Sequence, residues 1–303
     1  MPQKLYHLQK LQHMVKTGLF FAALFLGLCS CNLISEHFIR KSGEMEKQGN
    51  TDKAIRFLLA AEVLDKKNPD INLQIAAHYL ALEQEDWART EYYKAMNKNT
   101  SSGELVMACI GMEIKTGNYW SALSLFRKLD MSHAKSPDLP YALKGLAYFG
   151  IPNYDSVIVY FDQAIHHCPD RAVHYIHRGY ALAALERYPE ALADYRTAVS
   201  IDSLRPDVFL NKADLWYILE DYPRALVNYN LAMALMHNRY GITEQATVVY
   251  HNRARTYLAL GDTLRAMKDQ ATASDLGPVD PIRRFDLFGS DIIRMALAQR
   301  PGK

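Results

Sequence analysis

Histidine and cysteine side chains gather in one short stretch near the middle of the chain. His166, His167 and Cys168 are consecutive, and His174 and His177 follow at a spacing that places both on one helix face. Imidazole and thiolate groups are ligands that suit zinc. Their spacing matches no zinc motif, however, and histidine also favours helix C-termini for electrostatic reasons. We therefore predict no metal site, and bound zinc that is lost on replacing His174 would contradict this.

Other patterns that carry catalysis are missing from the sequence. It contains no Gly-x-Ser-x-Gly elbow, no His-Glu-x-x-His pair and no glycine-rich loop that could cradle a phosphate. Its many aspartates and glutamates are scattered over expected helix surfaces, where solvated charge is the usual role. We predict that the protein is not an enzyme and uses no cofactor.

Three short segments resemble the acceptor of one bacterial O-glycosylation system, in which Asp precedes Ser or Thr and an apolar residue follows. All three fall at expected turns, where an enzyme could reach them: Asp155-Ser-Val157, Asp202-Ser-Leu204 and Asp262-Thr-Leu264. A motif this short also occurs by chance, so the sequence leaves open whether these turns are glycosylated.

The first thirty residues have the composition of a secretory signal peptide. Three lysines and no acid precede an apolar run, 18–28. That run is too short to cross a hydrocarbon core of ~30 Å, and basic residues before a short apolar stretch are typical of export signals. The sequence does not decide whether Met1 or Met14 is the true start.

The apolar run ends in Leu28-Cys29-Ser30-Cys31, which resembles a bacterial lipoprotein box. Cys31 fits the lipidated position better, because bulky Leu28 precedes the other cysteine. Acyl chains that each contribute ~0.8 kcal/mol per buried CH₂ would anchor the protein to a membrane, with 31–34 as a short tether. By the same resemblance, Asn32 in place of Asp implies the outer membrane. The alternative is an ordinary cleaved signal with incidental cysteines.

The charge of the chain after removal of 1–30 is nearly balanced. Three lysines are lost, so the 35 basic residues fall to 32 against 33 acidic ones, a net charge of −1. Because no basic stripe is left that could release counterions from a polyanion, we predict no nucleic-acid partner. Only Cys109 and Cys168 accompany Cys31, too few for a disulfide framework.

A pattern of small residues returns about every 34 positions along most of the chain. One column of small residues is Ser42, Ala76, Gly111, Gly145, Gly179, Ala213 and Ala254; a second is Ala54, Ala88, Ala122, Val157, Ala191, Ala225 and Ala266. Helix axes pack 8 to 10 Å apart, and the close end of that range needs small residues where the backbones approach. A fixed period of this length predicts a stack of similar units.

Each unit is expected to be two antiparallel helices. In residues 172–205, apolar and small residues fall at helical spacing in two runs, separated by a turn at 186–189 in which Pro189 can start the second helix. Large residues alternate with the small columns, and most of the tyrosines belong to these packing columns. The pattern therefore predicts helical hairpins packed in series.

These features resemble the tetratricopeptide repeat family, in which 34 residues form two helices with Gly or Ala in the first and Ala, an aromatic and Ala in the second. The resemblance implies an all-α, right-handed α-solenoid of antiparallel helix pairs. It covers residues 35–280 in seven units, followed by a C-terminal capping helix in 281–303; the units are 35–68, 69–102, 103–137, 138–171, 172–205, 206–239 and 247–280, with an insert at 240–246.

In this family the first helices line a concave groove that binds peptides. Carried over, the groove of the second half would contain His177, Tyr180, Asn211, Asp214, Tyr217, His251, Asn252 and Arg255. His177, Asn211 and Asn252 take the same place in successive units, and such a ladder resembles relatives that hold a peptide backbone through amides. Solvated polar residues are the alternative. The Lys-Asn-Asn-Lys-Arg set with which some relatives grip a C-terminal carboxylate is missing.

The resemblance implies a non-catalytic scaffold or adaptor for protein–protein interaction. Together with the lipoprotein box it implies a membrane-anchored protein of the bacterial cell envelope that binds protein or peptide partners. The alternative is a regulator that recruits an envelope protease or a cell-wall hydrolase. The sequence identifies neither the partner nor the oligomeric state, since a fold alone does not assign a partner.

Overall fold

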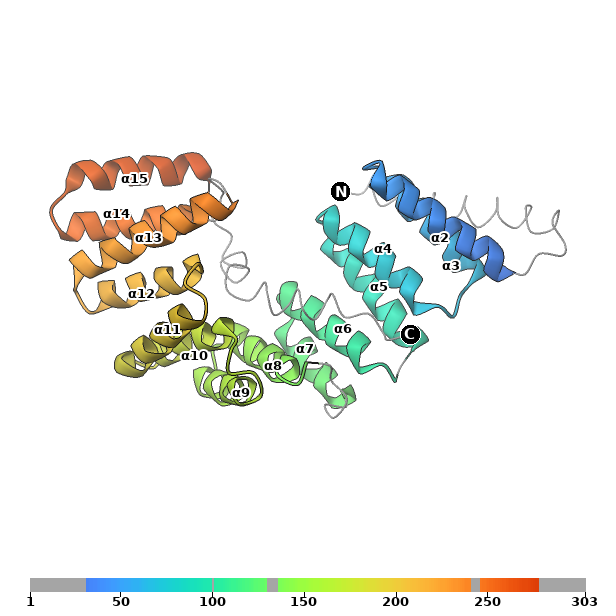
Figure 1. Ribbon diagram of the computed structural model, residues 1–303, viewed down its shortest axis with the longest axis horizontal. Helices are drawn as coiled ribbons and strands as arrows, with labels where there is room; N and C mark the ends of the chain where they lie inside the picture. The colour runs from blue at the N-terminus through green and yellow to red at the C-terminus, as the bar shows by residue number, and fades with distance from the viewer. Residues whose placement is uncertain (1–30, 100, 130–135, 241–245, 278–303) are drawn as a thin grey trace. The chain divides into compact units, whose positions relative to one another are not determined.

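The described part of the chain is helical apart from short turns and connections, and contains no strand. The computed structural model describes residues 31–99, 101–129, 136–240 and 246–277. They form two compact units, 31–116 and 117–277 (Figure 1). The predicted all-α class of helix pairs is confirmed for these residues. The signal peptide, most of the insert and the C-terminal cap lie outside the described residues.

The first unit holds five helices among its described residues. They are α2 (Cys31–Lys47), α3 (Thr51–Leu64), α4 (Pro69–Ala81), α5 (Glu85–Lys98) and α6 (Gly103–Lys115). Side chains cap several of their N-termini: Asn50 Oδ1 accepts from the Lys53 backbone N–H at 3.2 Å, and Ser102 Oγ accepts from that of Leu105 at 3.3 Å. Such caps satisfy N–H groups that have no partner within the helix.

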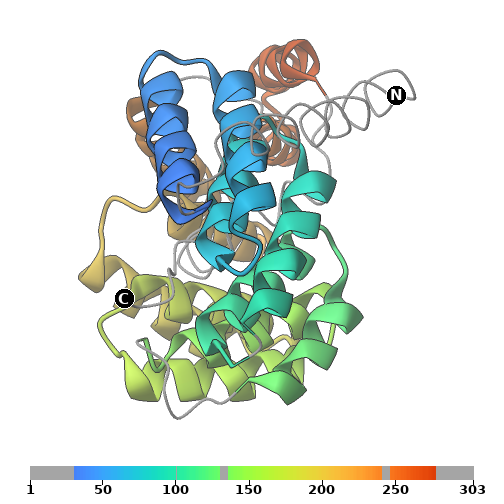
Figure 2. The same ribbon diagram turned by 90° about the vertical axis from the view of Figure 1, so that its right-hand side faces the viewer.

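The second unit continues the same alternation of helix and short turn. It contains α7 (Tyr119–Leu125), η1 (Phe126–Lys128), α8 (Leu139–Gly150), α9 (Tyr154–His167), α10 (Ala172–Ala184), α11 (Tyr188–Ile201), α12 (Pro206–Ile218), α13 (Tyr222–Tyr240), α14 (Ala246–Ala259) and α15 (Thr263–Leu276). Within it, α8 packs on α9, α10 on α11, α12 on α13 and α14 on α15. Both views show these neighbours side by side as hairpins (Figures 1 and 2).

The turn inside most hairpins contains one residue with a left-handed backbone. The residue is glycine at Gly49, Gly117 and Gly261, but Glu83, Glu186 and Glu220 have φ of 56°, 60° and 59° at the same place. The turn then closes with a bond back to the first helix, such as Arg187 N–H to the Leu182 carbonyl at 2.8 Å. Glycine adopts this conformation without steric cost, whereas other L-residues do not.

We therefore expect Glu186→Gly to raise the free energy of unfolding by about 0.5–1 kcal/mol, because it relieves the left-handed strain. Glu186 is exposed, so the substitution removes no buried contact. Urea denaturation followed by circular dichroism measures the change. The control is Ala193→Gly, at an exposed position inside α11, which should lower stability by about 1 kcal/mol. A loss of stability in both variants would contradict the prediction.

The small columns lie where helices approach most closely. Every member of the second column, from Ala54 to Ala266, is fully buried. A Cβ atom placed on Gly179 would lie 2.6 Å from the ring of Tyr195, and one on Gly145 would lie 2.7 Å from the ring of Phe161. The period of 34 residues thus records where an aromatic side chain of the second helix covers the backbone of the first.

In the second unit, an arginine on the first helix of a repeat contacts the second helix of its own repeat and the second helix of the preceding repeat, an arrangement that we call an arginine bracket. Arg178 donates from Nε and Nη2 to Asp194 of α11 at 2.8 and 2.6 Å, and from Nη1 to Asp162 of α9 at 2.7 Å. Arg253 repeats the arrangement, with both Nε and Nη2 donating to Asp269 and Nη1 to Asn230. A planar guanidinium suits such forked contacts. These brackets join one repeat to the next.

Between Arg178 and Arg253 the equivalent position is Lys212, which has no acidic partner among the described residues. It stands 34 residues after Arg178, and the positions of the two aspartates are taken by Arg196 and Asn228. Burial, with the nearby charge of Arg196, lowers the pKa of the Lys212 ammonium. The junction around α12 therefore lacks the bracket that its neighbours have.

Candidate functional site

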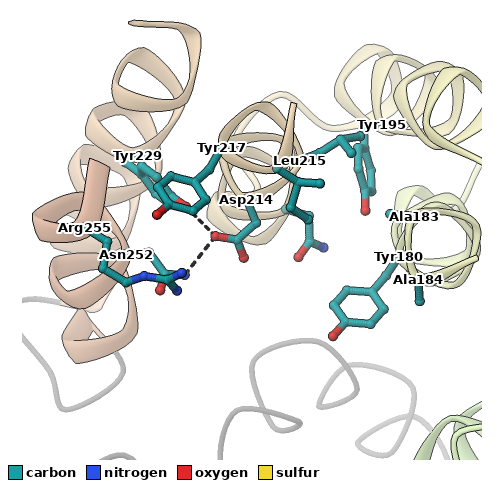
Figure 3. Close-up of a pocket in the computed structure, with 12 residues that line it drawn as sticks. Tyr180, Ala183, Ala184, Tyr195, Asp214, Leu215, Tyr217, Tyr229, Asn252 and Arg255 are labelled. Atoms are coloured by element: carbon teal, nitrogen blue, oxygen red, sulfur yellow. Dashed lines mark hydrogen bonds between the residues drawn. The ribbon is translucent and has the colours of Figure 1, made fainter. Parts of the chain in front are cut away.

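One pocket of about 320 Å³ opens on the first helices of the last three described repeats (Figure 3). α10, α12 and α14 supply most of its wall, and one tyrosine each comes from α11 and α13. The lining residues are Tyr180, Ala183, Ala184, Tyr195, Asn211, Asp214, Leu215, Tyr217, Ile218, Tyr229, Asn252 and Arg255. Its volume lies at the low end of pockets that bind small ligands, so it fits a short segment better than a folded element.

The carboxylate of Asp214 organises one wall of this pocket. Its Oδ1 accepts a hydrogen bond from the Tyr229 hydroxyl at 2.5 Å and another from Asn252 Nδ2 at 2.8 Å (Figure 3). Burial, together with the neighbouring Asp214 charge, raises the pKa of Tyr229, so its phenol stays protonated and donates at neutral pH. Asp214 thereby fixes the side chains of α13 and α14 relative to α12.

Arg255 lies at the exposed rim of the pocket. Its guanidinium carbon is 4.9 Å from the centroid of the Tyr217 ring, a cation–π distance. Over the described ranges it forms no ion pair, in contrast to Arg178 and Arg253. The aromatic ring orients the guanidinium while leaving its N–H groups available.

Asn211 lies at the buried side of the pocket. It is 4% exposed, and its Nδ2 is buried with no hydrogen-bond partner among the described residues. A buried amide donor without a partner is costly, and most such groups in native proteins are satisfied. The amide of Asn211 therefore marks a place where an occupant of the pocket can supply an acceptor.

Six of the eight predicted groove residues line this one pocket, and two histidines do not. His177 is 2% exposed and stacks on Phe161 with ring centroids 5.0 Å apart, so it belongs to the packing between α9 and α10. His251 is exposed outside the pocket, and its equivalent in the preceding repeat, Leu210, is buried in the core. The ladder proposed from the sequence is thus interrupted at its first member.

The pocket also contains residues that the sequence analysis assigned to packing or did not single out. Tyr195 and Tyr229 belong to the aromatic column that covers the small residues, yet both also line the pocket. Ala183 and Tyr217 take the same place in successive repeats, as do Ala184 and Ile218. Because Tyr217 was predicted to line the groove, its equivalent Ala183 and the next pair of equivalent positions, Ala184 and Ile218, could have been predicted from the spacing as well.

The cluster of histidines around Cys168 is divided among separate contacts. His174 Nε2 lies 2.9 Å from Asp138 Oδ2, and both side chains are almost completely buried. His167 stacks on Tyr141, with ring centroids 5.1 Å apart. Burial, and a hydrogen bond to Asp138, raise the pKa of the Cys168 thiol, which disfavours a reactive thiolate. Over the described residues, no three His, Cys, Asp or Glu side chains are placed to hold a metal ion.

The pocket offers hydrogen bonding and apolar contact rather than a nucleophile. None of its twelve lining residues is serine, threonine, cysteine, lysine or histidine, and its one carboxylate, Asp214, accepts hydrogen bonds from Tyr229 and Asn252. The glycosylation motifs lie elsewhere, at the starts of α9 and α15 and after α11; Ser203 and Thr263 are exposed there, and Ser156 is partly exposed. Their modification stays a prediction.

Cys31, the residue predicted to be lipidated, is the first residue that the structure describes. α2 begins at Cys31, whose side chain lies outside the described residues, as does everything before it. Among the helices that are described, none combines the length and apolar character needed to cross a bilayer. Lipidation therefore stays a prediction from the sequence.

Helix pairs in regular succession, joined by buried small columns, define this chain as an α-helical repeat protein. The family model for the tetratricopeptide repeat matches residues 175–203, which cover most of α10 and α11. No curated protein matches the chain. The solved structures that resemble it supply the wider comparison.

Several solved structures share the fold at low sequence identity. A crystal structure of a tetratricopeptide repeat protein from Parabacteroides merdae ATCC 43184 has a TM-score of 0.68 and 16% identity, over 88% of this chain and 99% of that chain. A chain of the APC/C hetero-tetramer Cut9–Hcn1 has a TM-score of 0.62 and 15% identity, over 84% and 48%. MamA from Desulfovibrio magneticus RS-1 has a TM-score of 0.51 and 18% identity, over 56% and 95%.

The matched repeat and these neighbours show that α10 and α11 match the tetratricopeptide repeat and that the chain shares the fold of tetratricopeptide-repeat proteins. The 14 α-helices of its described residues fit about seven repeats. Folds of this kind serve as surfaces for protein partners and are generally non-catalytic.

Proposed function

We propose that this protein is a scaffold that binds an extended segment of a partner protein in the pocket formed by α10, α12 and α14. The observation that carries the proposal is the convergence of six predicted groove residues on one cavity. Among the described residues, the buried amide nitrogen of Asn211 has no hydrogen-bond partner there, and Arg255 is held by the Tyr217 ring. The fold itself supports a role in assembly, and one structural neighbour belongs to a hetero-tetramer.

The proposed place of action is the bacterial cell envelope, with the protein held at the outer membrane by lipid on Cys31. The support is the sequence Leu28-Cys29-Ser30-Cys31 after a basic and apolar leader. Because α2 begins at Cys31, the repeats would start next to the membrane.

We expect Cys31→Ser to release most of the protein from membranes, because a chain without acyl groups loses its anchor. Fractionation of cells into membrane and soluble material, followed by immunoblotting, measures the release. Cys29→Ser is the matched control and should leave the protein with the membranes. Unchanged membrane association of the Cys31 variant would remove the lipid assignment.

The binding proposal is tested by photo-crosslinking in intact cells. A benzophenone amino acid replaces Tyr217 or Tyr180 in the pocket, and Val159, which is 54% exposed on α9, serves as the matched position outside it. The expected result is one partner protein crosslinked from both pocket positions and absent from the Val159 sample, identified by mass spectrometry.

Crosslinks that form equally from Val159, or from neither pocket position, would contradict the pocket as the binding surface. If the partner is a protease or a cell-wall hydrolase, its activity with and without the scaffold decides between an adaptor and a recruiting regulator. A partner whose activity is unchanged indicates the adaptor.

A further inference from the structure

The junction around α12 brings two cations together without an acid. Lys212 is partly buried where the neighbouring repeats have an arginine, and Arg196 stands where the arginine bracket of Arg178 has Asp162, whose Oδ1 lies 2.7 Å from Arg178 Nη1. Burial and then the charge of Arg196 lower the pKa of the Lys212 ammonium. Among the described residues neither cation forms an ion pair. An acid from outside the described chain can take the place that Asp162 has at its own junction.

The acids of the second helices beside this junction do not neutralise it. α11 carries Glu190 and Asp194, which are already paired with Arg187 and Arg178. α13 carries no aspartate or glutamate along its whole length. The surface shared by α11 and α13 is therefore positive, and complementary charge steers an acidic partner towards it.

α13 also presents a stripe of apolar side chains to solvent. Val227 is 66% exposed and Leu231 is 41% exposed, and Ala234 is exposed as well. Their spacing of four and then three residues places them on one side of the helix. None of them lines the pocket. A stripe with this spacing fits a partner helix whose own apolar residues recur at i, i+4 and i+7.

The equivalent surface two repeats earlier gives an internal comparison. Val159 on α9 is equivalent to Val227 and is 54% exposed. The cation beside it, Arg178, is paired with both Asp162 and Asp194. An exposed valine thus occurs at both places, whereas cations without an acid occur beside only one of the two.

We propose that Arg196, Lys212 and the apolar stripe of α13 bind an acidic amphipathic helix of a protein partner. A carboxylate of that helix takes its place between Arg196 and Lys212, and the apolar residues of the helix pack on Val227 and Leu231. This surface belongs mainly to second helices and lies outside the pocket. The inference therefore goes beyond the proposed function and gives the scaffold a second binding surface.

The test is photo-crosslinking of the full chain in intact cells. A benzophenone amino acid replaces Val227, with Val159 as the matched position, and the crosslinked segment of the partner is mapped by mass spectrometry. The expected result is a segment that carries aspartate or glutamate beside apolar residues at helical spacing. It should be crosslinked from Val227 and absent from the Val159 sample.

Arg196→Asp is the decisive variant, because it supplies Lys212 with the acid that Arg178 already has. In urea the variant should be at least as stable as the parent, while the yield of the Val227 crosslink falls about tenfold because the place of the partner's carboxylate is filled. Arg265→Asp makes the same change of charge at an exposed position on α15 and should leave the yield unchanged. If Arg196→Asp loses stability, Arg196→Gln, which only removes the positive charge, is measured in its place and should lower the yield several-fold.

Four results would each overturn the inference: no protein crosslinked from Val227, equal crosslinking from Val159, a mapped segment without an acidic residue, or a yield that the Arg196 variants leave unchanged. Crosslinks to lipid alone would also overturn it and would assign this surface to the membrane. Crosslinking from Tyr217 tests the pocket separately, so either surface can fail while the other stands.

Discussion

Replacing Arg178 by leucine is expected to lower the free energy of unfolding by about 3 kcal/mol, because breaking a buried ion pair leaves one charge without a partner. Arg178 donates two hydrogen bonds to Asp194, whose side chain is only 8% exposed. The hydrogen bonds to Asp194 outweigh burial and raise the pKa of the Arg178 guanidinium, so Arg178 stays charged. Urea denaturation followed by circular dichroism measures the loss.

The matched control is Arg187→Leu, which removes an equally well-shaped but exposed pair. Arg187 donates from Nε and Nη2 to Glu190, both at 2.7 Å, and both side chains are largely in solvent. Exposed pairs contribute about 0–1 kcal/mol, so this variant should be nearly as stable as the parent. Equal losses in the two variants would show that burial of Asp194 is not what makes Arg178 important.

Replacing Gly179 by alanine is expected to cost about 2 kcal/mol, although alanine is the better helix former. The added Cβ would lie 2.6 Å from the Tyr195 ring, and Tyr195 is 1% exposed and enclosed by core residues of α11, α12 and α13. The ring cannot move aside without disturbing its neighbours. Thermal and urea unfolding would both show the loss.

Gly43→Ala supplies the matched control, since nothing lies within 4 Å of a Cβ at that helical position. It should gain about 0.5–1 kcal/mol from helix propensity. A second check is the background Tyr195→Leu, in which Gly179→Ala should cost much less because the ring is gone. A persistent cost in that background would mean that the ring is not the cause.

The fold was predictable because close packing leaves its record in residue size. Where two backbones approach, small residues are favoured, mostly glycine or alanine, and the period of those residues gives the length of the repeat. The third repeat departs from this pattern, because Leu129 stands where the other repeats have Ala61, Ala95, Ala164, Ala198, Ala232 and Ala273. It is also the repeat whose second helix, α7, is short and ends in the 3₁₀ turn η1.

The site was predictable only in part, because residue type does not reveal direction. Asn211 and His177 take the same place in successive repeats, yet the amide lines the pocket while the imidazole stacks on Phe161. Tyr229 was assigned to packing, which its ring does; its hydroxyl also binds Asp214. A tyrosine packs through its ring and forms hydrogen bonds through its hydroxyl, and residue spacing predicts only the packing of the ring.

The interruption at Lys212 has a mechanical consequence. In a row of repeats each unit is held mainly by its neighbours, so under tension the repeats from α10 to α15 should separate first around α12, where the arginine contact to two second helices is missing. Walls of the pocket come from α10 and α14, on either side of that weak point. A bound partner segment would then contact the helices on both sides of α12, so the complex should resist extension at forces that unfold the protein without its partner.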